Sequence, residues 1–243
     1  MSEYYRESLD LNKNLKINYK QSLEATIGNI LKCCFNDRGI DVEMETFSAL
    51  LQSMKSLEIY EDNSVFCSYD LDSNTILFNK NKNIDKDKQY YDFLSTVMDI
   101  ISTNYIDGKF TQGLTFKDED GKKYGKVLND RLKDRLILLS FGDTKYNESV
   151  KDFFIDSPND SATLLDEMFV QLDSVISSND LISFYINGRS DLLLQKLGDY
   201  GKAYIKNLDK YNKENSALIR NECDLLMKSI ESMKKQRNSQ KIA

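Results

Sequence analysis

Histidine is absent from the 243-residue chain. This absence excludes nucleophiles activated by histidine, histidine acid–base catalysis and every zinc site that needs an imidazole ligand. Cysteine is scarce, and Cys33, Cys34, Cys67 and Cys223 do not have the C-x₂-C spacing of a zinc knuckle. A cytosolic chain would keep these thiols reduced, and we expect most of them to pack in the core. Chemistry by carboxylate, lysine, tyrosine or cysteine side chains remains open.

Proline occurs once, at Pro158, and glycine is sparse, so helices can run long and no obvious linker divides the chain. No apolar run approaches the ~18 residues of a membrane-spanning helix. The polar N-terminal sequence lacks the apolar core of a signal peptide, so we expect a cytoplasmic protein without a membrane partner. A net charge of −6 and a pI near 5.0 argue against nucleic-acid binding, which depends on neutralising phosphates.

Apolar residues make up 40% of the sequence, which is enough for a substantial core. Helical periodicity predicts helices over residues 19–35, 44–57, 90–102, 126–140, 147–155, 161–176 and 180–187. Short β-prone runs predict hairpins over residues 64–79 and around Asp120–Gly121. From Tyr200 onward we expect one long helix or two abutting helices that dock onto the body. The predicted fold class is therefore α+β and mainly α.

The turn of the first hairpin, DLDSN, imitates the start of a calcium-binding loop through Asp70, Asp72 and Asn74. However, the sixth position of that loop is Thr75 rather than glycine, and the twelfth is Asn81 rather than glutamate. We therefore predict an Asx-rich turn instead of a calcium site.

The helix predicted over residues 90–102 has one strongly apolar face and one polar face. The apolar face comprises Tyr90, Phe93, Leu94, Val97, Met98 and Ile101. The polar face carries Ser95, Thr96 and Asp99, and Ser95 shares its side with Asp99 because four residues separate them. In an H-E-x-x-H helix, the same spacing places two imidazoles on one metal ion while the glutamate activates water.

A second pair of acids, Asp130 and Asp134, lies four residues apart on the helix predicted over residues 126–140, directly after Asn129. Both acids are opposite the leucine stripe of that helix. One interpretation is a solvated face on which they pair with neighbouring cations. The candidate cations are Arg131, Lys133 and Arg135.

These two helices resemble the zincin-type, gluzincin-like metallopeptidase-like proteins of low-GC Gram-positive bacteria. In that family an H-E-x-x-H helix precedes an N-E-G-x-T-E-like helix that supplies the third metal ligand. In STVMDIIST, Ser95 and Asp99 replace the histidines and Thr96 replaces the catalytic glutamate. In LNDRLKD, Asp130 takes the third-ligand position and Asp134 that of the following acid. The resemblance covers roughly residues 64–197.

The resemblance implies zincin-like helices, short hairpins and a long C-terminal helix in one compact unit. Its parts would be an N-terminal helical part over 1–63, a metallopeptidase-like core over 64–198 and a C-terminal helical extension over 199–243.

Loss of both imidazoles and of the glutamate implies a catalytically inactive protein without zinc or another cofactor. The predicted vestigial cleft contains Ser95, Thr96, Asp99, Asn129, Asp130 and Asp134. We expect the protein to act by binding a protein or peptide, because zincins hold an extended peptide along a sheet edge. The predicted binding edge consists of Thr75, Ile76, Leu77, Phe78 and Asn79.

Two alternatives stay open. Asp99, Asp130 and Asp134 would suit Mg²⁺ or Ca²⁺ in an enzyme that uses carboxylate ligands. The chain could instead be a helical scaffold that forms oligomers through its C-terminal helix. The apolar repeat of that helix is Ile219, Cys223, Leu226, Ile230 and Met233.

Overall fold

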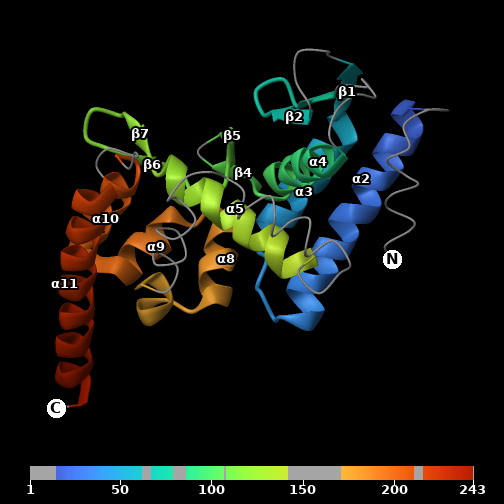
Figure 1. Cartoon of the computed structure of the whole chain (residues 1–243). Helices are drawn as coiled ribbons and strands as arrows, with labels where there is room; N and C mark the ends of the chain where they lie inside the picture. Colours follow the sequence, from blue (N-terminus) through green and yellow to red (C-terminus); the bar gives the residue numbers. More distant parts are fainter. Residues whose placement is uncertain are drawn as a thin grey trace.

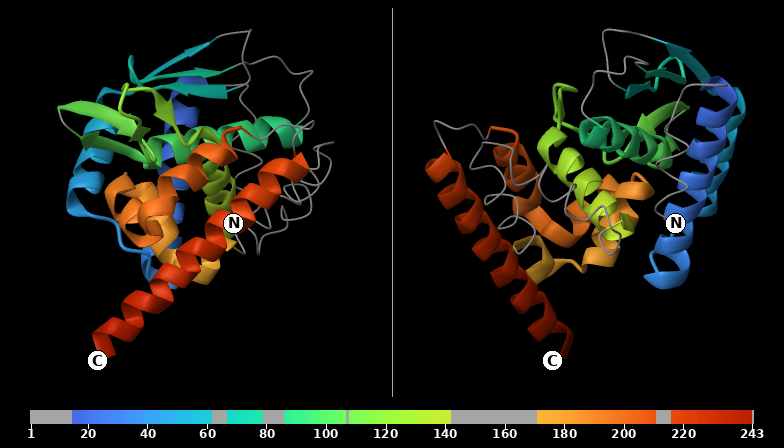
Figure 2. Two further views of the ribbon diagram at one scale, coloured as in Figure 1. Left: turned by 90° about the vertical axis from the view of Figure 1, so that its left-hand side faces the viewer. Right: turned by 45° about the vertical axis from the view of Figure 1, so that its right-hand side comes forward.

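The computed structural model describes residues 15–61, 67–78, 86–106, 108–141, 171–210 and 216–242. Within these ranges the chain is mainly helical with a few short strands, which confirms the predicted α+β, mainly α class. The strands gather on one side of the helical body, and α4 and α5 run through its middle (Figure 1; Figure 2). The helix predicted over 147–155 and most of the one predicted over 161–176 lie outside the described residues.

The helices begin and end close to the predicted boundaries. The described helices are α2 (Leu15–Lys32), the π-helical turn η1 (Cys33–Asp37), α3 (Met44–Ser56), α4 (Lys86–Ile101), α5 (Lys126–Phe141), α8 (Ser178–Ile186), α9 (Ser190–Leu197), the 3₁₀ turn η2 (Gly198–Tyr200), α10 (Gly201–Leu208) and α11 (Ser216–Ile242). Helix α9 was not predicted, because its leucines are adjacent and show no helical period in so short a segment.

Helix α4 forms the centre of the core. Phe93, Leu94, Val97, Met98 and Ile101 are all at most 2% exposed, which confirms the predicted apolar face over these residues. The helix contacts α2, α3, α5 and strand β2 (Cys67–Asp70). Burial of one such side chain contributes about 1.5–3 kcal/mol, so this face alone is a large part of the folding free energy.

Three strands form a sheet in the order β1-β3-β2. Strand β2 and β3 (Thr75–Phe78) make the predicted hairpin, while β1 (Glu58–Glu61) runs parallel to β3 on its other side. The prediction that Thr75, Ile76, Leu77 and Phe78 form a free binding edge is therefore wrong, since β3 is hydrogen-bonded along both sides. Asn79 lies outside the described residues.

The turn between β2 and β3 is held by side-chain amides and carboxylates. Asp70 accepts hydrogen bonds from the Asp72 amide at 3.1 Å and the Ser73 hydroxyl at 2.7 Å. Asn74 adopts a left-handed φ of 51°, and its Oδ1 accepts a bond from the Ser53 hydroxyl of α3 at 2.8 Å. These contacts confirm the predicted Asx-rich turn.

Two further hairpins follow α4. Strand β4 (Thr103–Ile106) pairs with β5 (Lys109–Gln112), and β6 (Phe116–Lys117) pairs with β7 (Lys123–Tyr124). The β6–β7 hairpin was predicted, and its Gly121 has the positive φ of 77° that such a turn requires. The β4–β5 hairpin was not predicted, because it begins directly where the helical pattern of α4 ends.

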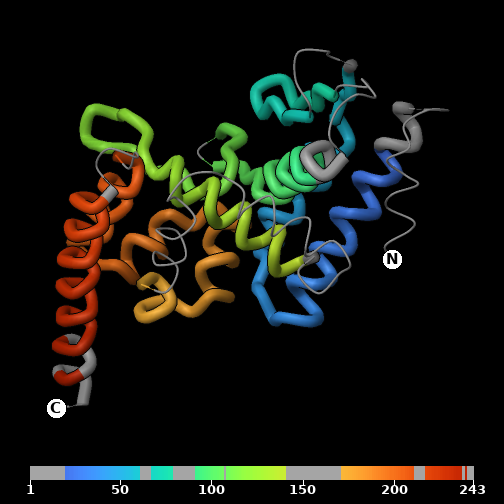
Figure 3. The backbone as a smooth tube through the Cα atoms, viewed as in Figure 1, coloured from blue at the N-terminus to red at the C-terminus, as the bar shows by residue number. Residues whose placement is uncertain are grey.

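The C-terminal region consists of two helices, α10 and α11, that pack against each other. Ile219, Cys223 and Ile230 of the apolar repeat are at most 3% exposed, and Met227 joins them while Leu226 is only half-buried. The tube in Figure 3 shows α11 alongside α10. The prediction that this region docks onto the body is thus confirmed for the apolar face of α11. No helix in the described part of the chain is long and apolar enough to cross a membrane.

Candidate functional site

The predicted vestigial cleft lies where α4 packs against α5. Lys133 of α5 donates hydrogen bonds from its Nζ to both carboxylate oxygens of Asp99 of α4, at 3.0 and 3.3 Å. The two side chains are 17% and 22% exposed. A nearby cation therefore neutralises Asp99, and the ion pair links the two helices that the resemblance assigns to the metal site.

Asp134 does not lie on a solvated face, as its position opposite the leucine stripe had indicated. It is 7% exposed, because Tyr91 of α4 covers it. The Tyr91 hydroxyl donates to Asp134 at 2.6 Å, and Arg131 forms an ion pair with it at 2.9 Å. Asp130, by contrast, is exposed. The interpretation of a solvated face thus holds for Asp130 and is wrong for Asp134.

Burial sets the protonation behaviour of these acids. It raises the pKa of Asp99, while Lys133 opposes that rise and Asp130 adds to it. Burial likewise raises the pKa of Asp134 against the opposing effect of its hydrogen bond from Tyr91. The acids are close enough to act on a common neighbour: Tyr185 of α8 has a raised pKa, first through burial and then through charges at α4 and α5. The contributing acids are Asp99, Asp130 and Asp134.

Thr96 and Asn129 serve the packing of other elements. Thr96 is 1% exposed and donates from Oγ1 to the Cys67 sulfur at 3.3 Å, so it faces strand β2 and not α5. Asn129 clamps the segment before β6: its Oδ1 accepts from the Leu114 amide at 2.8 Å, and its Nδ2 donates to the Leu114 carbonyl at 2.7 Å. Ser95 is half-buried. Thr96 and Asn129 of the predicted cleft therefore bond to β2 and to the segment around Leu114, not to the ion pair of Asp99 and Lys133.

A cavity of about 610 Å³ lies between α3, the β4–β5 hairpin and the turn from α8 to α9. The turn carries Arg189, whose guanidinium binds both carboxylate oxygens of Asp191 at 3.2 and 3.1 Å. Its Nη1 also donates to Glu43 at 2.6 Å. Asp191 and Glu43 raise the pKa of Arg189, and Arg189 lowers the pKa of Asp191.

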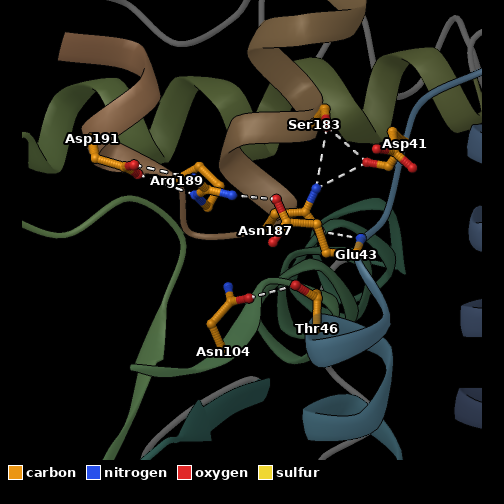
Figure 4. A network of polar contacts seen from close by, with 8 residues as sticks. All are labelled: Asp41, Glu43, Thr46, Asn104, Ser183, Asn187, Arg189 and Asp191. Atoms are coloured by element: carbon orange, nitrogen blue, oxygen red, sulfur yellow. Dashed lines mark hydrogen bonds and ion pairs between the residues drawn. The ribbon is translucent and has the colours of Figure 1, made fainter. Parts of the chain in front are cut away.

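Buried amides fix the walls of this cavity (Figure 4). Asn187 accepts from the Glu43 amide at 2.8 Å and donates to the Asp41 carbonyl at 2.9 Å. Asn104 accepts from the Thr46 hydroxyl at 2.9 Å and donates to the Ile186 carbonyl at 2.9 Å. These bonds join α3, β4 and α8, so the cavity has a fixed frame built from segments far apart in the sequence.

A second cavity of about 480 Å³ lies between β5, the β6–β7 hairpin and the start of α5. Its apolar wall comprises Leu71, Phe110, Leu114, Phe116 and Tyr124. Phe110 also makes an edge-on contact with Tyr105, with ring centroids 5.2 Å apart. Two polar atoms at β5, Thr111 Oγ1 and Gln112 Nε2, are buried without a hydrogen-bond partner among the described residues. Buried polar atoms usually have partners, so these two are exceptions, as is Ser140 Oγ of α5.

The chain matches no protein-family model, no curated protein and no solved structure at a significant level.

Sequence reasoning missed both cavities. Arg189 follows Asn187 and Gly188, and such a turn signal could have placed it at a bend, although its partner Glu43 is distant in sequence. Nothing in the sequence indicated that the acids of α4 and α5 would raise the pKa of Tyr185. Among the described residues, no group of three His, Cys, Asp or Glu side chains is placed to hold a metal ion.

Proposed function

We propose that this protein is a catalytically inactive relative of the zincin-type metallopeptidases, acting in the cytoplasm by binding a protein or peptide. One observation supports the proposal most strongly: Asp99, at a position that the resemblance assigns to a metal ligand, holds the ammonium group of Lys133 at 3.0 Å. A lysine charge then takes the role of a metal charge between the same two helices. A metal ion at Asp99 would first have to displace this ion pair.

The remaining chemistry at these positions is consistent with binding rather than hydrolysis. Thr96 stands where the family has its catalytic glutamate, and its hydroxyl donates to Cys67 instead of facing the ion pair. A threonine hydroxyl is no general base near neutral pH, and no imidazole can hold a metal-bound water. Selection for partner binding would keep the fold while these groups were lost.

Rebuilding the metal site tests the proposed ancestry. The variant carries Ser95→His, Asp99→His and Lys133→Ala, which restores two imidazoles and removes the competing ammonium. Thr96 stays, because the family's glutamate is a base and not a ligand. We expect the variant to bind one zinc ion at least ~100-fold more tightly than the wild type, measured by calorimetry with zinc alone.

The matched control adds Asp130→Ala, which removes the predicted third ligand and should weaken zinc binding at least ~10-fold. Circular dichroism verifies that both variants are folded. Equal zinc affinity with and without Asp130, or no gain in affinity at all, would reject the zincin relationship. Hydrolysis of casein by the wild-type protein with added zinc, lost in Asp130→Ala, would contradict the proposed inactivity.

A further inference from the structure

Strand β5 has a free hydrogen-bonding edge in the described part of the chain. Its one pairing partner there is β4, and β4 packs along α3 on its other side. The register pairs Asn104 with Thr111 and Ile106 with Lys109. A free edge presents unpaired amide and carbonyl groups that a further strand can bind.

The outward groups of β5 belong to Phe110 and Gln112. The Gly113 amide donates to the Ser102 carbonyl at 2.8 Å, which makes that pair a hydrogen-bonded one. Hydrogen-bonded and non-bonded pairs alternate along an antiparallel ladder, so Thr111 and Lys109 bond to β4. The backbone N–H and C=O groups of Phe110 and Gln112 therefore point away from β4.

A cavity lies on each face of this strand. Lys109 and Thr111 line the cavity of about 610 Å³, whereas Phe110 and Gln112 line the one of about 480 Å³, and Thr111 borders both. Successive side chains of a strand point to opposite faces. A strand added to β5 would thus place its side chains alternately into the two cavities.

The two cavities differ in chemistry. Lys109 and Lys117 line the larger one, and no described carboxylate forms an ion pair with either. Of the acids in its lining, Glu43 and Asp191 are bound by Arg189, and Glu45 at the start of α3 is exposed. The smaller cavity has the aromatic and leucine wall described above. An acidic side chain is therefore favoured beside Lys109 of β5 and Lys117 of β6, and the smaller cavity favours an apolar one.

We infer that β5 binds an extended peptide as a third strand of the β4–β5 sheet, with an acidic residue beside Lys109 and Lys117 and the adjacent apolar residue against Phe116 and Tyr124. The inference rests on the proposed binding function and names its site and its partner class. Backbone pairing gives such complexes their affinity, and the cavities give them specificity.

The probe is a phage-displayed library of random dodecapeptides, selected against the full-length chain. We expect enrichment of peptides in which an acidic residue neighbours an apolar one. Amide exchange measured by NMR then locates the site. Without peptide, the amides of Phe110 and Gln112 should exchange fast while those of Lys109 and Thr111 are protected. A saturating selected peptide should slow exchange at Phe110 and Gln112 at least ~10-fold.

Two matched variants separate backbone pairing from side-chain contacts. Gln112→Pro removes one outward N–H and should weaken peptide binding at least ~10-fold, whereas Gln112→Ala keeps that donor and should weaken it less. Lys109→Glu together with Lys117→Glu should reverse the preference for acidic peptides. Calorimetry with the selected peptides measures each affinity.

Failure of the inference and failure of the proposed function have different signatures. If selected peptides bind while Gln112→Pro has no effect and Phe110 stays unprotected, the β5 site is wrong and the binding function stands. If no peptide is enriched, the inference is overturned. If peptides bind at β5 and are cleaved, the site stands and the proposed inactivity fails.

Discussion

The buried acids at the α4–α5 interface have partners, whereas two buried polar atoms at strand β5 have none among the described residues. At the interface, Asp99 and Asp134 are largely buried and each is matched by a partner from the same pair of helices. At β5, Thr111 and Gln112 keep buried atoms without a described partner, and a cavity adjoins each face. Buried polar groups usually have partners, so the two atoms at β5 are exceptions. The cavities beside β5 therefore make the hairpin a better candidate for a binding site than the α4–α5 interface.

The architecture explains the contrast. Helices α4 and α5 each carry an apolar stripe, and Leu94 and Leu132 are fully buried between their neighbours. Because protein interiors are closely packed, little space is left between the polar faces of these helices, and their charged side chains form direct ion pairs. The β4–β5 hairpin has only two short strands, and such a hairpin depends on packing against other elements for its stability. Space remains beside it for another segment.

The largest expected effect is the difference in stability between an aspartate placed in the packed face of α4 and one placed on β5. Leu94→Asp places a charge where the side chain is 0% exposed and should prevent folding, since an unpaired buried charge costs more than a typical fold can lose. Phe110→Asp, at a position 37% exposed beside a cavity, should cost about 1 kcal/mol or less. Urea unfolding followed by circular dichroism measures both. A well-folded Leu94→Asp variant would show that the apolar face of α4 is not tightly packed.

Features that depend on local spacing could be predicted from the sequence, whereas features that depend on contacts between distant segments could not. The apolar face of α4 follows from local spacing, and so does the β2–β3 turn, where Asp70 and Ser73 bond within four residues. The parallel pairing of β1 with β3 depends on contacts between distant segments, and it turned the predicted edge into a central strand. The burial of Asp134 depends on Tyr91, 43 residues earlier. Local pattern thus identified the elements, while their long-range packing determined which polar faces are open.

The same limit applies to the candidate site. Ser95, Asp99 and Asp130 were selected by spacing alone, and spacing does not reveal whether a cation or a void lies opposite. The cavities at β5 are bounded by Glu43, Arg189 and Asp209 from three separate segments. No motif links those residues in the sequence, so only the folded arrangement brings them together.

A smaller effect tests how tightly the interface is closed. Lys133→Met leaves Asp99 without its cation and should lower the free energy of unfolding by about 1–3 kcal/mol. The double variant Asp99→Leu and Lys133→Met removes both charges and should be more stable than Lys133→Met alone, because no uncompensated carboxylate remains. Urea unfolding of both variants and of Asp99→Leu completes a double-mutant cycle.

The matched control for this cycle is the ion pair of Arg189 with Asp191, where Asp191 is 67% exposed. Its coupling should be within the ~0.2–1 kcal/mol of surface pairs. If both cycles give the same coupling energy, the ion pair at the α4–α5 interface is no stronger than the exposed pair at the cavity rim, and the proposed difference between the two regions is wrong.

The smallest expected effect is that the stability contributions of Asp99 and Asp191 change with pH in opposite directions. Burial raises the pKa of Asp99 above its ordinary value of 3.8, so its contribution to stability is present below pH 3.8 and is lost as pH rises through the folded-state pKa. Arg189 lowers the pKa of Asp191, so that contribution is present above pH 3.8 and is lost as pH falls through the folded-state pKa.

The test subtracts the unfolding free energy of each asparagine variant from that of the wild type at several pH values. As pH rises from about 3 to 6, the difference for Asp99→Asn should fall and that for Asp191→Asn should grow. Low salt is needed, because screening weakens the exposed pair at Asp191 first. Slopes of the same sign would mean that Lys133 outweighs burial at Asp99. The α4–α5 interface would then be an ordinary hydrated ion pair that a metal ion could still displace.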